Sequence, residues 1–133
     1  MADLETSAVT PVGVWNFNGG AATNIFHSLT TGVQAAGTTQ GTATALTKHI
    51  NNVTVVATNQ DGVKLPSAVA GMKVVIINKD ATDPLKVWPA TGDDLGAGVN
   101  AVSGVTILAG ASRTYYAIDD TYWIGLAGQT VVL

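Results

Sequence analysis

The stretch MKVVIIN, residues Met72–Asn78, carries the strongest strand signal in the chain. Its four consecutive aliphatic residues, 74–77, favour a strand that is buried on both faces. Upstream, residues 49–58 read HINNVTVVAT, a run rich in β-branched residues, and the turn-forming NQDG at 59–62 ends it. The middle of the chain is therefore predicted to form adjacent strands of one buried sheet.

Further short strands are expected downstream, at intervals of roughly ten residues. Upstream, residues 25–29 alternate as a short strand would, and residues 30–47 are low in complexity and predicted to be irregular or loosely stranded. Regularly spaced short strands with no convincing helix predict an all-β fold, a small antiparallel β-sandwich or barrel. The downstream strands are expected at 63–66, 85–88, 102–108, 113–118 and 122–126, with an edge strand at 130–133.

Two parts are expected along the chain. Residues 1–20 are predicted to form an extended N-terminal arm, because Pro11 and Gly13 oppose a helix and Gly19-Gly20 is a turn or flexible link. Residues 21–133 are predicted to form a single sandwich or barrel domain, defined best between 48 and 126. The residues expected in its core are Val74, Ile76, Leu85, Val87, Ile107, Tyr115, Trp123 and Ile124, with Met72 and Leu65 close behind.

Charge is sparse and unevenly distributed. The 133 residues carry a net charge of −3, and 11% are charged, against about 25% in a typical soluble domain. Residues 6–47 and 121–133 contain no Asp, Glu, Lys or Arg. Such neutral ends are expected where other subunits cover them, although Thr, Asn and Gln alone could also hydrate them. The acidic balance argues against a nucleic-acid partner, because Lys and Arg supply the affinity for phosphate.

Targeting and redox signals are absent from the sequence. It contains no cysteine, which excludes disulfides and thiolate chemistry. No apolar run approaches the roughly 20 residues that span a bilayer, so no membrane partner is expected. The first residues carry Asp3 and Glu5 where a signal peptide would be basic. We therefore expect a protein made in a cytoplasm.

Residues that could carry chemistry are few. His27 and His49 do not have the spacing of metal ligands. The pairs Asp93-Asp94 and Asp119-Asp120, together with Asp80 and Asp83, are expected in turns, with calcium binding as the alternative. No nucleophile, phosphate-binding or dinucleotide motif is present. We expect no enzyme activity, no cofactor and no small-molecule substrate.

Residues 61–126 resemble a β-module that recurs in bacteriophage virion proteins. The matching pieces keep a fixed order: a V-x-L-P strand, the A-G-M-x-V-x-I-x-N strand, V-W-P-A-T-G-D, a Gly/Asn-rich loop, L-A-G-x-S and a final tryptophan. They stand at Val63–Pro66, Ala70–Asn78, Val87–Asp93, Gly96–Asn100, Leu108–Ser112 and Trp123.

The resemblance implies a structural role in a virion. The function it suggests first is a capsid decoration (cement) protein on the head surface, bound to the major capsid protein and present as a homotrimer. A tail, baseplate or fibre component is an alternative. A carbohydrate-binding module is another, with its aromatic residues as stacking faces: Trp88, Tyr115, Tyr116 and Trp123.

The arm lies outside the resembling residues and is too apolar for a solvated tail. Such a segment cannot offset its ordering entropy by burying itself, so it is expected to order on a partner surface. The residues predicted to contact the capsid or a neighbouring subunit are Val12, Val14, Trp15 and Phe17. The alternative is that the arm is simply the first strand of the sandwich.

Overall fold

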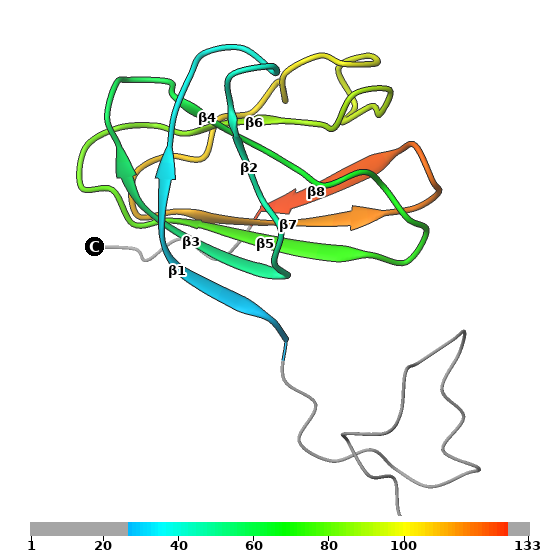
Figure 1. Cartoon of the computed structure of the whole chain (residues 1–133), viewed down its shortest axis with the longest axis horizontal. Coiled ribbons are helices and arrows are strands. Elements are labelled where there is room, and N and C mark those ends of the chain that lie inside the picture. Colours follow the sequence, from blue (N-terminus) through cyan, green and yellow to red (C-terminus); the bar gives the residue numbers. More distant parts are fainter. Residues whose placement is uncertain (1–26, 128–133) are drawn as a thin grey trace, which may run out of the picture.

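The computed structural model describes residues 27–127, which contain strands and loops and no helix (Figure 1). The expected all-β class is confirmed for this part of the chain. The eight strands are β1 Leu29–Ala35, β2 Thr44–Ala45, β3 Ile50–Val56, β4 Gly62–Lys64, β5 Lys73–Asn78, β6 Lys86–Trp88, β7 Ser112–Ala117 and β8 Trp123–Ala127. Residues 30–35, expected to be irregular or loosely stranded, belong to β1.

The strands form two sheets, and the expected antiparallel arrangement is wrong for most of them. One sheet has the order β1-β3-β5-β7-β8 and the other β2-β4-β6. The pairs β1–β3, β3–β5, β2–β4 and β4–β6 are parallel, and only β5–β7 and β7–β8 are antiparallel. In Figure 1 the three short strands lie together on one side of the five-stranded sheet.

The parallel pairing follows from the path of the chain. From β1 to β6 each strand is followed by a strand of the other sheet, so the chain returns to each sheet after one full turn of a coil. A strand that returns in this way runs in the same direction as the strand it joins. The spacing of about ten residues between strand signals therefore reflects alternation of the chain between two sheets, whereas an antiparallel sandwich or barrel was expected.

The expected strand at 102–108 does not form. This segment makes a single bridge, between Ile107 and Leu85, and Ser103 donates one backbone hydrogen bond to the carbonyl of Val87. Its backbone touches the β6 segment at these two places and bends between them. It therefore lies as an irregular loop beside the small sheet.

Strand β5 lies in the middle of the large sheet, between β3 and β7. Val74 and Ile76 are buried and point inward, whereas Val75 and Ile77 are only partly buried and lie on the opposite face. Burial on both faces was expected, and only the inner face is fully covered. The aliphatic run therefore supplies apolar side chains to the outer face of the sheet as well as to the core.

The core joins residues from both sheets in one cluster. Nine of the ten predicted core residues are buried or packed against it, Met72 being only partly buried. Ile124 is the exception: it is 44% exposed because it follows Trp123, which is fully buried, and neighbouring residues of a strand point to opposite faces. The confirmed buried residues are Leu65, Val74, Ile76, Leu85, Val87, Ile107, Tyr115 and Trp123.

A buried asparagine fixes the loops at one end of β5. Asn78 is fully buried, and its side-chain amide donates to the backbone carbonyls of Asp83 and Ile107. Its side-chain carbonyl accepts a hydrogen bond from the backbone N–H of Asp80. Because a buried amide without partners is costly, these bonds hold the 79–85 turn and the 103–111 loop against the sheet.

Candidate assembly surfaces

The outer face of the large sheet carries a row of residues that crosses all five strands. Leu29 pairs with Ile50, Ile50 with Val75, Val75 with Thr114, and Thr114 with Leu126. Aligned residues of paired strands lie on the same face of a sheet. Four of these five side chains are aliphatic, so an apolar band runs from one edge of the sheet to the other. We call these five residues the outer row.

The outer row is open at both ends. Leu29 and Leu126 are 52% and 54% exposed, and the three residues between them are partly buried. Beside the row lie Tyr116, 37% exposed, and its cross-strand partner Ile124. Adjacent exposed apolar side chains are common on surfaces that contact other molecules.

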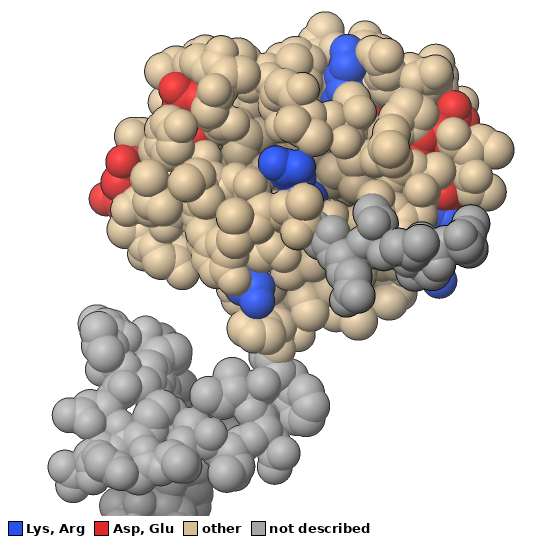
Figure 2. Space-filling view, turned by 180° about the vertical axis from the view of Figure 1, so that it is seen from behind, with Lys and Arg blue, Asp and Glu red and all other residues tan. Residues whose placement is uncertain are grey.

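Lys73 places a positive charge next to the row. It pairs with Tyr116 across β5 and β7, and its Nζ lies 5.8 Å from the centroid of the tyrosine ring. A cation at this distance from an aromatic face is attracted by the ring. Figure 2, which shows one face of the molecule, displays few and well-separated charged side chains on a mostly uncharged surface.

Two histidines meet where the row begins. The rings of His27 and His49 are edge to face, 5.6 Å between centroids, and Ser28 Oγ lies 3.1 Å from His49 Nδ1. With Ile50, Lys73 and Val75 they line a hollow of about 30 Å³. Sequence spacing did not predict this pair, because parallel β1–β3 pairing brings residues 22 positions apart together. The residues described include no cluster of three groups suited to a metal.

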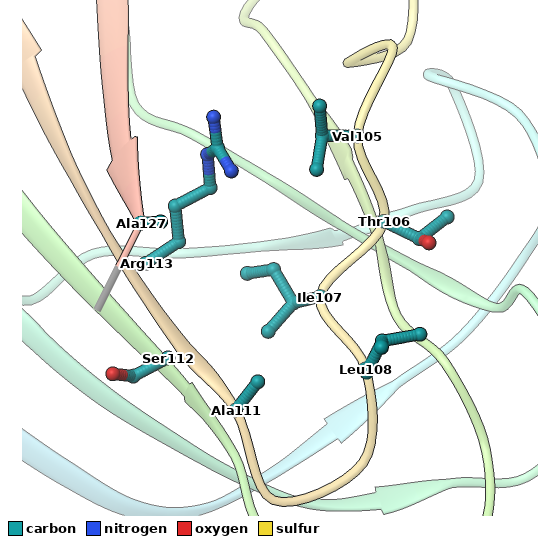
Figure 3. Close-up of a pocket in the computed structure, with 8 residues that line it drawn as sticks. All are labelled: Val105, Thr106, Ile107, Leu108, Ala111, Ser112, Arg113 and Ala127. Carbon is teal, nitrogen blue, oxygen red and sulfur yellow. The ribbon is translucent and has the colours of Figure 1, made fainter. Parts of the chain in front are cut away.

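A second hollow, of about 170 Å³, lies between the start of β7 and the 105–108 loop (Figure 3). Its apolar walls include Val105, Ile107 and Leu108, and Arg113 rises along one side next to Ala127. Arg113 Nη2 donates to the carbonyl of Gly125 at 3.3 Å. The hollow can hold an apolar side chain beside a fixed cation.

Gly125 makes room for the side chains next to this hollow. A Cβ at this position would lie 2.7 Å from Arg113 Nε and 2.9 Å from Tyr115 Cε1. Burial raises the pKa of Tyr115 to about 12, and the Arg113 charge opposes part of that rise. The phenol therefore stays neutral at ordinary pH, and its place is in the core.

The acidic residues that were candidates for calcium cap turns. Asp93 Oδ2 accepts the backbone N–H of Ala68 at 2.7 Å, and Asp94 Oδ1 accepts those of Gly96 and Gly98. Asp80 accepts three backbone N–H groups, and these bonds lower its pKa from 3.8 to about 2. Hydrogen bonds from Thr121 likewise lower the pKa of Asp119. The turn interpretation is the one that this geometry supports.

The aromatic residues considered for carbohydrate stacking are mostly enclosed. Trp123 is fully buried, Tyr115 is 1% exposed, and Trp88 is partly buried with its indole nitrogen enclosed. Only Tyr116 presents an exposed ring, and Lys73 lies over it. The predicted contact residues of the arm fall outside the described part of the chain: Val12, Val14, Trp15 and Phe17.

The chain was compared with protein-family models, with curated proteins and with solved structures. No protein-family model, no curated protein and no solved structure matches this chain. No helix within residues 27–127 is long and apolar enough to cross a membrane. What the protein does must therefore be inferred from its own residues.

Proposed function

We propose that this protein is a structural subunit that assembles with other protein chains, and specifically a decoration protein on the outer surface of a bacteriophage head. The observation that carries the proposal is the outer row, an apolar band across a whole sheet with exposed leucines at both ends. Burying such a band is the main source of affinity in protein association.

The sequence supplies the second support. Residues 61–126 resemble a β-module of phage virion proteins in the order of their motifs, and the buried residues of the two sheets form one cluster, which fits the sandwich that we propose. Uncharged stretches at 6–47 and 121–133 fit a subunit that is covered on assembly. The proposed partners are the major capsid protein and further copies of this chain, on the virion.

The test is binding to capsids of the encoding phage assembled without this protein. Leu126→Lys places a charge at the open end of the outer row, and Val99→Lys places the same charge on a loop, where Val99 is 63% exposed. We expect Leu126→Lys to weaken co-sedimentation by about tenfold or more, the effect of roughly 1.4 kcal/mol. Val99→Lys should bind as the unchanged protein does.

The alternatives predict other results. Labelling of intact virions with an antibody against this chain should mark the head; a signal confined to the tail would replace decoration by the tail, baseplate or fibre assignment. Unchanged capsid binding by Leu126→Lys would show that the outer row does not contact the capsid. The carbohydrate alternative has no support from Trp123 or Tyr115, because both rings are buried.

A further inference from the structure

We propose that the outer row binds the N-terminal segment 9–17 of a neighbouring copy of this chain, so that copies are linked by exchanged arms. This inference names a partner for the surface on which the proposed function rests. It is argued from the direction in which the chain enters the sheet, from the length and apolar pattern of the segment, and from charge.

The first argument is direction. Before β1 begins, Ser28 already pairs with the edge of β3: its carbonyl accepts the N–H of Ile50, and its Oγ accepts the N–H of His49. The ring of His27 packs against that of His49. Residues 27 and 28 therefore already run in line with β1, and Leu29, which follows them, is one end of the outer row. A segment that continued in this direction would leave the sheet, and it would have to turn back to lie across its own row.

The second argument is size and pattern. Five strands at about 4.8 Å spacing make the row about 19 Å across. Nine extended residues reach about 30 Å, so segment 9–17 can cross it. Alternate residues of an extended segment share one side. Val9, Trp15 and Phe17 would share the side facing the row, and large aromatic residues dominate interfaces of this kind.

The third argument is charge. Lys73 lies beside the outer row, and the only charges among the first 47 residues are Asp3 and Glu5. Lys73 is positive and the two acids are negative, and residues 6–17 carry no charge. A neutral apolar segment with an acidic end therefore complements an apolar band with a flanking lysine.

The experiment uses the absence of cysteine from the chain. Val9→Cys is combined with Leu126→Cys or with Leu29→Cys, one at each end of the row, and each full-length double variant is treated with a short bifunctional thiol cross-linker. Val9→Cys with Val99→Cys is the control, because Val99 lies on a loop and is at least as exposed. We expect one of the two row pairs to give covalent multimers several-fold faster than the control.

Two results would overturn the proposal. A cross-linked product with the mass of one chain would show that segment 9–17 covers the sheet of its own chain. Multimers that form no faster than in the control would show that the segment does not contact the outer row of another copy. Adding Trp15→Ala to the reactive pair should slow multimer formation several-fold, and Asn16→Ala, on the other side of the segment, should not. If Leu126→Lys still weakens capsid binding when no cross-link forms, the proposed function stands and the exchanged arm does not.

Discussion

At the residue scale, Ile76 is the centre of the inner face of β5 and has no exposed surface. We predict that Ile76→Ala lowers the free energy of unfolding by about 2–5 kcal/mol, from lost burial and the cavity left behind. Ile124→Ala is the matched control, because this isoleucine is 44% exposed on the opposite face. Its cost should be below about 1 kcal/mol, measured by chemical denaturation of both variants. Equal costs would contradict the assignment of the inner face.

Asp80 gives the pH dependence of stability a definite sign. Backbone N–H groups of Val56, Thr82 and Asp83 lower its pKa in the folded protein from 3.8 to about 2. A depressed pKa stabilises the folded state above pH 3.8, and that contribution is lost as the pH falls towards about 2. We predict that Asp80→Asn flattens the fall in melting temperature over this range. An unchanged slope would contradict the role of these bonds.

At the element scale, we expect the N-terminal arm to be separable from the strands. β1 begins at Leu29 and pairs with β3 along its length. We predict that a chain lacking residues 1–17 stays folded, with a melting temperature within a few degrees of the full chain, and loses its binding to undecorated capsids. Circular dichroism and co-sedimentation measure the two effects. Unfolding of the truncated chain would make the arm a core strand.

The elements also show how far sequence could predict this fold. β3, β5 and β7 were predictable because aliphatic, β-branched and aromatic residues are concentrated in these runs. β2 is two residues long, too short for any pattern to emerge, and its place in the fold is set by pairing with β4 further along the chain. The same long-range register produces the outer row and the pair of His27 and His49, so neither could be found from spacing.

At the scale of the whole molecule, the exposed outer row and the uncharged ends favour association. We predict a homotrimer, with light scattering after size exclusion giving a mass three times that of the 13.5 kDa chain. Leu126→Lys should shift the distribution towards monomer, and Val99→Lys should not, because only the former lies on the row. A wild-type monomer at micromolar concentration would contradict self-association in solution.

The coiled path through two sheets also governs how quickly the native state can form. Among the described strands only β7 and β8 are consecutive in sequence and paired with each other. Every other strand pair joins segments that are separated in sequence by at least one further strand. Proteins dominated by such non-local pairing refold in milliseconds to seconds. Refolding followed by tryptophan fluorescence should fall in that range, since Trp123 becomes enclosed only when both sheets have met. A newly made chain would thus complete its fold only after its last described strand has been synthesised.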